Sequence, residues 1–196
     1  MKIIAATKNR GKIREFQAIL GGLGAEIVSQ GDEGIDVDVV ETGNSFIENA
    51  LIKARAIAML CDDAVLADDS GLCVDALDGR PGIFSARYAG ADATDAEKME
   101  KVLKELEGER DRSARFVSAV ALILPDGREV TAQGEVRGYI TEGPVGDGGF
   151  GYDPIFYSTE LEKTFGQATD AEKNRVSHRG RALEQLYGKI QQMMGE

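Results

Sequence analysis

Residues 2–20 read KIIAATKNRGKIREFQAIL and divide into three parts. Residues 2–6 are apolar apart from Lys2, as in a strand that is buried on both faces of a parallel sheet. Residues 7–12 are polar and include one glycine. From Ile13 onward, apolar residues recur at helical spacing until two glycines end the pattern. This stretch therefore predicts a strand, a short polar turn and a helix, which is the first unit of a chain that alternates strands and helices.

The same alternation continues along the chain. Further strands are predicted at 26–29 and 64–67, the second ending at Asp68-Asp69-Ser70-Gly71. Residues 115–124 and 129–140 predict a β-hairpin, because a Pro-Asp-Gly-Arg turn separates them.

Helix starts are marked by three capping boxes, in which Ser or Thr precedes Glu by three residues. They lie at Ser45–Glu48, Thr94–Glu97 and Thr169–Glu172, and a last helix is expected near 179–194. Hairpins and crossovers together predict an α/β fold with a mixed twisted sheet flanked by helices. Without an internal repeat or linker, residues 1–196 are expected to form one domain, with or without two lobes.

Composition excludes several classes of protein. The net charge of −11 opposes binding to duplex nucleic acid and to anionic membrane surfaces. No run of 18 apolar residues can span a membrane. Cys61 and Cys73 lack metal-ligand spacing and are interpreted as small apolar residues in a reducing cytosol, so a cytoplasmic location is expected. His178 is the only histidine, which excludes zinc sites built on several histidines.

The turn Thr7-Lys8-Asn9-Arg10-Gly11-Lys12 is a candidate phosphate-binding loop. A helix N-terminus offers amide groups and a partial positive charge, and three cations add to them. It is not a Walker loop, because the earlier glycine and the following Ser or Thr are absent. The alternative is an ordinary polar helix cap with solvated lysines.

The pair Asp68-Asp69 is a candidate magnesium site. Adjacent carboxylates at a strand end repel each other unless a positive group lies nearby, and Mg²⁺ prefers carboxylate and phosphate oxygens. Glu41 is a plausible third carboxylate. Without other motifs, a turn is the preferred interpretation of Asp-Asp-Ser-Gly.

Two segments near the C-terminus carry further candidates. The loop Gly146–Gly151 formally matches a dinucleotide fingerprint, but no strand leads into it and no helix follows, so we reject that match. Its aromatic residues Phe150 and Tyr152 can instead pack against a base. Lys173 and Ser177-His178-Arg179 offer donors for a phosphate or for the oxygen edge of a base. For each segment the alternative is ordinary surface structure.

Together these segments resemble the inosine triphosphate pyrophosphatase family, also described as the non-canonical purine nucleotide pyrophosphatases. The matching motifs occur in family order through nearly the whole chain. They are Thr7-x-Asn9-x-Gly11-Lys12, Glu41-Thr42-Gly43-x-Ser45-Phe46-x-Glu48-Asn49-Ala50 with Lys53-Ala54, Ala67-Asp68-Asp69-Ser70-Gly71-Leu72, Pro81-Gly82-Ile83-Phe84-Ser85-Ala86-Arg87-Tyr88-Ala89-Gly90, Gly149-Phe150-Gly151-Tyr152-Asp153-Pro154-Ile155-Phe156 and Ser177-His178-Arg179-Gly180. Lys8 departs from the pattern, because the family usually has a small residue there.

The resemblance implies an elongated two-lobed fold with the active cleft between the lobes, and a homodimer. It implies Mg²⁺-dependent hydrolysis of inosine, deoxyinosine or xanthosine triphosphate (ITP, dITP or XTP) to the monophosphate and pyrophosphate. Asp69 would be the general base, and Glu41 and Asp69 would bind the metal. The substrate would be bound by Thr7, Lys8, Asn9, Arg10, Gly11, Lys12, Ser70, Phe150, Gly151, Tyr152, Asp153, Lys173, His178 and Arg179.

Two other functions stay open at this point. One is a Maf-like pyrophosphatase for other modified nucleotides, which the Phe150–Asp153 loop and Ser177-His178-Arg179 disfavour. The other is a nucleotide sensor without turnover, which the presence of Glu41 with Asp68 and Asp69 disfavours, because a sensor needs no hydrolytic base.

Overall fold

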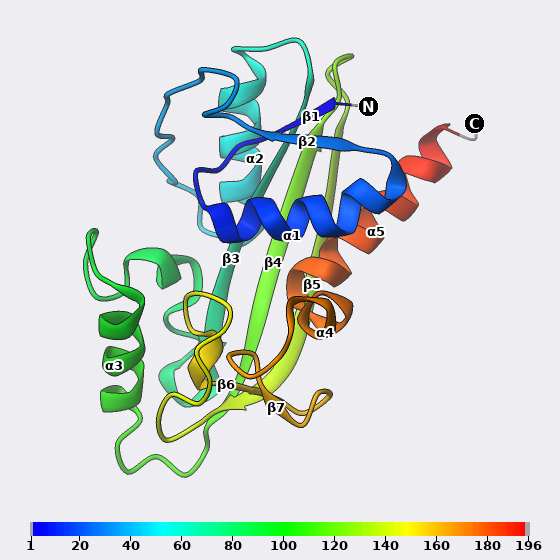
Figure 1. Cartoon of the computed structure of the whole chain (residues 1–196). Helices are drawn as coiled ribbons and strands as arrows, with labels where there is room; N and C mark the ends of the chain where they lie inside the picture. The colour runs from blue at the N-terminus through cyan, green and yellow to red at the C-terminus, as the bar shows by residue number, and fades with distance from the viewer. Residues whose placement is uncertain (1, 195–196) are drawn as a thin grey trace. The chain divides into compact units, whose positions relative to one another are not determined.

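Strand β1 (Lys2–Ala5) pairs in parallel with β2 (Glu26–Ser29) and with β3 (Ala64–Val74). This parallel core belongs to a seven-stranded sheet of order β2-β1-β3-β4-β5-β6-β7 in the computed structural model, which describes residues 2–194 (Figure 1). Strand β6 pairs antiparallel with both β5 and β7. The sheet is therefore mixed, as the sequence predicts.

The predicted helices and the predicted hairpin strands form in the expected order, whereas the two short strands at 156–158 and 163–164 were not predicted. The helices and remaining strands are α1 (Arg10–Leu20), α2 (Phe46–Ala58), α3 (Asp95–Glu105), β4 (Ser113–Ile123), β5 (Glu129–Ile140), β6 (Phe156–Ser158), β7 (Lys163–Thr164), α4 (Asp170–Val176) and α5 (His178–Met194), with short 3₁₀ helices at Gly21–Leu23, Asp75–Leu77, Gly82–Arg87 and Asp153–Ile155. No helix among the described residues is long and apolar enough to cross a membrane.

The chain divides into two compact units. Unit 1 comprises Met1–Asp69, Ser118–Gly134 and Arg179–Glu196, and unit 2 comprises Ser70–Val117 and Glu135–His178. The chain thus passes from one unit to the other within three strands and at the start of α5. Each unit has its own apolar core and is described by itself below.

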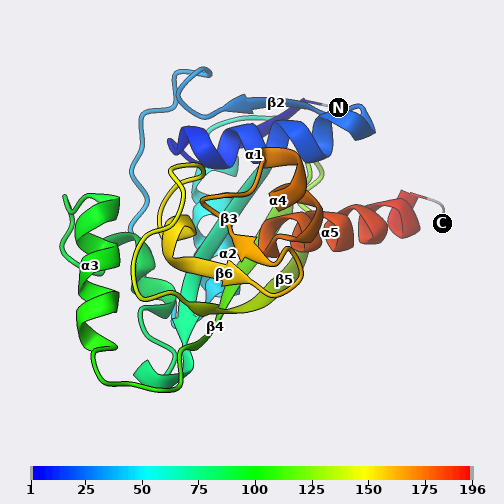
Figure 2. The same ribbon diagram turned by 60° about the horizontal axis from the view of Figure 1, so that its bottom comes forward.

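Unit 1 has a core on each face of its parallel strands. On one face, Ile3 and Leu66 pack with residues of α1 and α5. On the other face, Ile4 and Val65 pack with residues of α2. Figures 1 and 2 show α1 and α2 on opposite sides of these strands. The alternation follows from strand geometry, in which successive side chains point to opposite faces. Burial on both faces explains why residues 3–5 and 64–67 are continuous apolar runs.

Unit 2 has an aromatic core. Phe116, Phe156 and Phe165 contact one another, with ring centroids 4.6–6.0 Å apart. Aliphatic side chains from β3, α3 and β5 pack around these rings. Cys73 of this unit is buried as expected, whereas Cys61 of unit 1 is only partly buried.

Two local predictions need correction. The strand predicted at 64–67 does not end at Asp68 but continues to Val74, so Asp68, Asp69 and Ser70 are strand residues and not a turn. At the start of α2, Ser45 accepts from the Glu48 amide, but the Glu48 carboxylate accepts from the Asn44 amide and not from Ser45. The capping boxes at Thr94 and Thr169 form as predicted.

Gly138 of β5 tests how closely the strands of unit 2 pack. A Cβ atom at this position would lie 2.0 Å from the Tyr157 carbonyl oxygen of β6, and backbone cannot move as easily as a side chain. We expect Gly138→Ala to lower the free energy of unfolding by about 1–3 kcal/mol in urea denaturation. Gly143→Ala is the control, because a Cβ there meets no atom within 4 Å. Equal stabilities of the two variants would contradict this packing.

Candidate active site

Asp68 and Asp69 lie on opposite faces of β3. Alternate residues of a strand point to the same face of the sheet. Asp68 therefore points to the same face as Leu66, which packs with residues of α1 and α5. Asp69 points to the same face as Ala67, which packs with residues of α2. Both carboxylates are buried, with 2% and 6% of their surface exposed. The strand therefore separates two adjacent negative charges and gives each its own set of partners.

Asp69 receives a hydrogen bond from helix α2. The Asn49 amide nitrogen donates to Asp69 Oδ2 at 3.0 Å. The backbone N–H of Gly43 donates to Asn49 Oδ1 at 2.8 Å and so fixes which way the amide points. A Cβ on Gly43 would lie 2.7 Å from that same oxygen, so glycine allows the loop to approach α2 this closely.

Burial raises the pKa of Asp69 to about 6, from an ordinary value of 3.8. The Lys53 ammonium acts in the opposite direction, Glu41 raises the pKa further, and Asn49 and Lys12 lower it. Desolvation disfavours the charged carboxylate, and one amide donor does not fully compensate for the lost water. A carboxyl group with this pKa can exchange a proton near neutral pH.

Glu41 and Lys53 form an ion pair beside Asp69. Lys53 Nζ lies 2.5 Å from Glu41 Oε1, and both side chains are largely buried. Lys53 follows Asn49 by four residues, so both project from one face of α2. Two carboxylates and an ammonium group thus share one region of unit 1.

The carboxylate oxygens of Glu41 and Asp69 are suitable ligands for a hard cation. Mg²⁺ is typically held by one or two carboxylates, with waters and substrate phosphates completing its coordination. Glu41 is close enough to Asp69 to raise its pKa, so their charges already act on each other. Within residues 2–194, no group of three or more His, Cys, Asp or Glu side chains forms a metal cluster. The two carboxylates fit the share of Mg²⁺ coordination that a protein usually supplies when waters and substrate phosphates supply the rest.

Asp68 belongs to a buried ion-pair network. Lys12 Nζ of α1 lies 3.0 Å from Asp68 Oδ1. The Arg179 guanidinium of α5 contacts Asp68 Oδ2 through two nitrogens, at 3.1 and 3.2 Å, and also donates to Glu15. Burial lowers the pKa of Lys12, whereas Glu15 and Asp68 outweigh burial and raise the pKa of Arg179. Asp68 is therefore surrounded by cations and Asp69 is not.

The predicted phosphate loop caps its own helix. Asn9 Oδ1 accepts from the amides of Gly11 and Lys12, at 2.8 and 3.2 Å. Two of the amides expected to bind phosphate are thus already paired. Lys8, the departure from the family pattern, pairs with Asp36 and Asp38 of the following acidic loop.

In unit 2, Lys173 and Asp153 form a second buried ion pair. Lys173 Nζ lies 2.6 Å from Asp153 Oδ2, and the same carboxylate oxygen accepts from the Phe150 amide. The ammonium lies 4.5 Å from the centroid of the Phe150 ring, in a cation–π arrangement. A Cβ on Gly149 would lie 2.1 Å from Asp153 Oδ2, so glycine is needed for this turn.

The aromatic residues of unit 2 differ in what they can contact. Tyr152 is buried, and its hydroxyl donates to the Ser85 carbonyl, so its ring is part of the core. Phe150 is only half-buried. The His178 imidazole is buried and stacks on Phe116 at 4.8 Å. The Gly151 amide donates to Asp95, at the start of α3.

The structure groups the predicted residues by unit. Those of unit 1 are Thr7, Lys8, Asn9, Arg10, Gly11, Lys12, Glu41, Asp69 and Arg179, and those of unit 2 are Ser70, Phe150, Gly151, Tyr152, Asp153, Lys173 and His178. Glu41 and Asp69 come together in unit 1, whereas Lys12 and Arg179 gather around Asp68. Phe150, Asp153 and Lys173 come together in unit 2.

Three residues in contact with the predicted site residues, Asn49, Lys53 and Glu15, were not themselves predicted as site residues. Asn49 and Lys53 stand four apart in the predicted helix, and that spacing together with their polar character was the available signal. Glu15 gave no signal, because a glutamate in a helix is usually solvated. It becomes visible only through its contact with Arg179.

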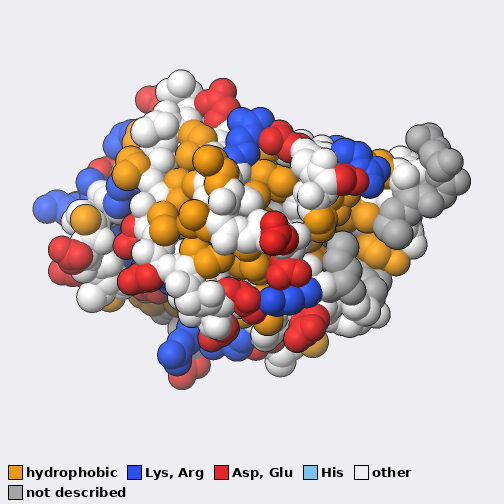
Figure 3. Space-filling view, turned by 90° about the horizontal axis from the view of Figure 1, so that it is seen from above, with side chains coloured by type: hydrophobic (Ala, Val, Ile, Leu, Met, Phe, Trp, Pro, Cys, Tyr) orange, Lys and Arg blue, Asp and Glu red, His pale blue; other side chains and the backbone are white. Residues whose placement is uncertain are grey.

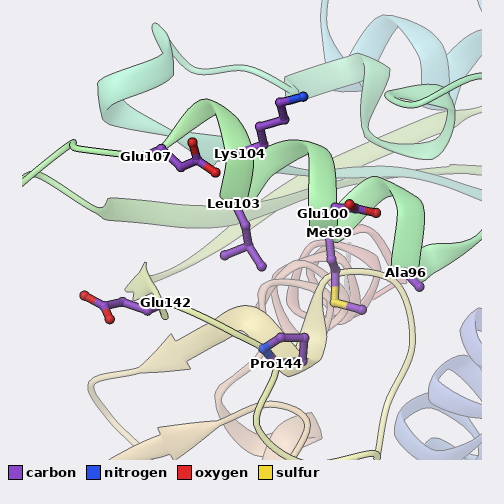
Figure 4. Close-up of a pocket in the computed structure, with 8 residues that line it drawn as sticks. All are labelled: Ala96, Met99, Glu100, Leu103, Lys104, Glu107, Glu142 and Pro144. Carbon is purple, nitrogen blue, oxygen red and sulfur yellow. The ribbon is translucent and has the colours of Figure 1, made fainter.

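A pocket in unit 2 lies beside helix α3 and includes none of the predicted residues. It has a volume of about 420 Å³ and is lined by Ala96, Met99, Glu100, Leu103, Lys104, Glu107, Glu142 and Pro144. Figure 4 shows Met99 and Leu103 pointing from α3 toward Pro144, and Lys104 pointing away from them. Its lining includes no nucleophile and only one cation, so we assign it no role.

Comparison with known proteins places these residues in context. The model of the Ham1 family matches residues 3–189. A protein of Halalkalibacterium halodurans named dITP/XTP pyrophosphatase is 53% identical, over 93% of this chain and 95% of its own length. The protein of the same name from Bacillus subtilis is 47% identical, over 93% of each chain.

Solved structures agree over the whole chain. The Ham1 protein of Staphylococcus aureus superposes with a TM-score of 0.87 and 40% identity, covering 98% of this chain and 100% of that one. A HAM1 protein from Coxiella burnetii gives a TM-score of 0.87 and 42% identity, covering 98% and 99%. The predicted fold class and the family resemblance are both confirmed.

The raised pKa of Asp69 predicts how stability depends on pH. Between about pH 4 and 6 the folded protein binds a proton at Asp69 that the unfolded chain has released, so the free energy of unfolding falls as pH rises through this window. Asn at this position cannot ionise. We therefore expect the stability of Asp69→Asn relative to wild type to increase by about 1–3 kcal/mol between pH 4 and pH 7.5.

The measurement is urea denaturation at both pH values, in excess chelator so that bound cations do not contribute. Asp62→Asn is the matched control, because Asp62 is exposed. A pH-independent difference between Asp69→Asn and wild type would show that the Asp69 carboxyl titrates normally.

Proposed function

This chain belongs to the Ham1 family, and we propose that it hydrolyses non-canonical purine nucleoside triphosphates, such as ITP, dITP and XTP, to the monophosphate and pyrophosphate. The observation that carries the proposal in this molecule is Asp69, a buried carboxyl group beside Glu41 and Lys53. Hydrolysis of a phosphoanhydride needs a base for water and positive charge for the phosphates, and these residues supply both.

Asp69 acts as the general base in this proposal. A base works best when its pKa lies near the working pH, and burial moves Asp69 toward that range. Asn49 holds one carboxylate oxygen and fixes the orientation of the group. The other oxygen can accept a proton from the attacking water.

Glu41 and Asp69 would hold Mg²⁺. When bound, the cation supplies charge compensation for the triphosphate and lowers the pKa of water. Without the cation, Lys53 forms an ion pair with Glu41. With the cation present, Lys53 is available for a phosphate oxygen, because the two carboxylates no longer need its charge.

The remaining predicted roles concern binding. Lys12 and the Thr7–Lys12 turn are proposed to contact the phosphates. In unit 2, Ser70, Phe150, Gly151, Tyr152, Asp153, Lys173 and His178 are proposed to contact the nucleotide. The half-buried ring of Phe150 offers a face for stacking, whereas Tyr152 contributes mainly through the turn that it anchors.

We also propose that the protein is a homodimer. Several large apolar side chains are exposed, among them Met59 at 86%, Val40 at 76% and Phe84 at 51%. Figure 3 shows hydrophobic side chains gathered in the middle of one face, with charged side chains around them. Contiguous exposed apolar surface is typical of protein interfaces.

The first test of the proposal is the reaction product and its dependence on Asp69. Purified protein with Mg²⁺ and dITP or XTP is expected to release pyrophosphate, measured in separate assays for pyrophosphate and orthophosphate. We expect Asp69→Asn to lower kcat by about a hundredfold or more, because an amide cannot take the proton from water. Asp62→Asn is expected to retain wild-type kcat.

Direct release of orthophosphate, or an Asp69→Asn variant with near-normal kcat, would contradict the proposed mechanism. In the second case Asp68 would be the next candidate, although Lys12 and Arg179 already pair with its carboxylate.

A second test concerns Arg179, which the sequence predicts to read the 6-oxo group of the base. Arginine has donors but no acceptor, so it can pair with an oxygen and not with the amino group of adenine. If this role holds, Arg179→Lys lowers the ratio of kcat/KM for ITP over that for ATP by about tenfold or more.

Stability provides the control for this test. Arg179 lies between Glu15 and Asp68, so Arg179→Ala is expected to cost about 3–5 kcal/mol of stability by leaving buried carboxylates unpaired. Arg179→Lys keeps a positive charge there. An unchanged ITP-to-ATP ratio in this variant, with both activities reduced, would assign Arg179 to positioning Asp68 and leave base recognition to unit 2.

A further inference from the structure

Residues 150–153 of unit 2 form a tight turn that leaves one backbone donor to be paired elsewhere. The Asp153 amide donates to the Phe150 carbonyl at 3.3 Å and closes the turn. Gly151 has a φ of +64°, and Tyr152 has a φ of −92° and a ψ of 7°, as in a type II′ turn. Such a turn pairs the amide of its fourth residue, so the Gly151 amide needs a partner from outside it.

Helix α3 supplies that partner. The Gly151 amide donates at 2.7 Å to Oδ2 of Asp95, the first residue of α3, which lies 56 positions earlier in the chain. The other carboxylate oxygen, Asp95 Oδ1, lies 2.6 Å from the Lys98 ammonium. The Asp95 carboxylate therefore connects α3 to the turn, and Lys98 fixes its orientation.

The charge of Asp95 strengthens this connection. Burial raises the pKa of Asp95, but the Lys98 ammonium and the Gly151 amide outweigh burial, so the pKa lies below its ordinary value. The N-terminus of a helix also favours a negative charge. A hydrogen bond to an ionised acceptor is shorter and stronger than one to a neutral acceptor. The Asp95 side chain is 46% exposed, and that of Lys98 13%.

A second contact holds the other side of the turn. The Tyr152 hydroxyl donates to the Ser85 carbonyl at 2.8 Å. The Ser85 hydroxyl in turn donates to the Gly82 carbonyl at 2.6 Å and accepts from the Leu72 amide at 2.9 Å. The Pro81–Gly90 motif, to which the proposed function gives no role, thus anchors the Tyr152 ring, whereas Asp95 holds the backbone.

These contacts matter because the turn carries Phe150. Glycines with positive φ, Gly149 and Gly151, flank this residue, and glycine restricts the backbone less than any other residue. The direction of the Phe150 ring therefore depends on the partners of the turn. Within the turn, the Phe150 amide donates to Asp153 at 2.9 Å. Asp95 adds a constraint from a separate element.

We propose that Asp95 is a positioning residue for the nucleotide base. It holds the Gly151 amide and so fixes the Phe150–Asp153 turn in the conformation that presents the Phe150 ring for stacking. This inference rests on the proposed function, which assigns the turn to the nucleotide. Asp95 acts through the turn and not on a substrate atom. Loss of the contact weakens stacking of the base, whereas Asp69 belongs to unit 1 and keeps its own partners.

Steady-state kinetics with dITP tests this role through KM. We expect Asp95→Ala to raise KM by about tenfold and to leave kcat within about twofold of wild type, because a contact made equally to substrate and transition state changes KM alone. Asp95→Asn should raise KM by less than about threefold, because its side-chain oxygen still accepts from the Gly151 amide. Both variants lose the same charge at the start of α3, so the difference between them reports the hydrogen bond and not the helix.

Solvent exchange of the Gly151 amide proton, measured by NMR without nucleotide, reports the contact directly. We expect Asp95→Ala to accelerate this exchange by about tenfold or more, since the amide loses its acceptor, and Asp95→Asn to exchange nearly as wild type. Asp92→Ala is the matched control, an exposed carboxylate before α3 whose removal should change neither KM nor exchange. Asp95→Ala is expected to fold, because the Thr94–Glu97 capping box of α3 remains, and thermal unfolding checks this.

The outcomes separate this inference from the proposed function. An active Asp95→Ala enzyme with a wild-type KM overturns the positioning role alone. Equal KM values for Asp95→Asn and Asp95→Ala overturn it as well, because the hydrogen-bond acceptor would then make no difference. Unchanged Gly151 exchange in Asp95→Ala shows that the contact does not hold the turn. A wild-type protein that does not hydrolyse dITP overturns the proposed function, and the positioning role with it.

Discussion

The alternation of side chains along strand β3 is the constraint on which the rest of the site depends. Consecutive strand residues point to opposite faces, so Asp68 and Asp69 cannot share one environment. Asp68 meets Lys12 and Arg179, and Asp69 meets Asn49 of α2. The strand could not end at Asp68 without losing this separation, and its continuation to Val74 is therefore part of the chemistry.

As a consequence, the two neighbouring carboxyl groups of Asp68 and Asp69 have different electrostatic environments. Buried charge is tolerated when it is paired, as for Asp68 with its cations. Asp69 has one neutral donor, while Glu41 and Lys53 largely compensate each other beside it. Burial then dominates and raises the pKa of Asp69 to about 6. The fold thus raises the pKa of Asp69 in the metal-free protein, and a cation held by Glu41 and Asp69 would lower it again when substrate is present.

Much of this could be predicted from the sequence, for identifiable reasons. Apolar runs, helical stripes and the Thr94 and Thr169 capping boxes depend on local spacing, and they gave the elements and the α/β class. The motifs and the family resemblance pointed to Glu41 and Asp69 as site residues, and the structure brings these two side chains close together. The extension of β3 was missed because Asp-Asp-Ser-Gly has turn chemistry, and only burial between two helix layers overrides it. Glu15 and the partners of Arg179 depend on contacts 164 and 111 residues apart, which no local pattern contains.

The separation of the two carboxyl groups can be measured directly by NMR titration of the Asp side-chain carboxyl carbons in the metal-free protein. We expect the Asp69 signal to titrate with a midpoint near pH 6, because burial of this carboxyl group outweighs the cations near it. A midpoint for Asp69 near its ordinary value of 3.8 would contradict the claim that β3 places this carboxyl group in a buried environment of its own.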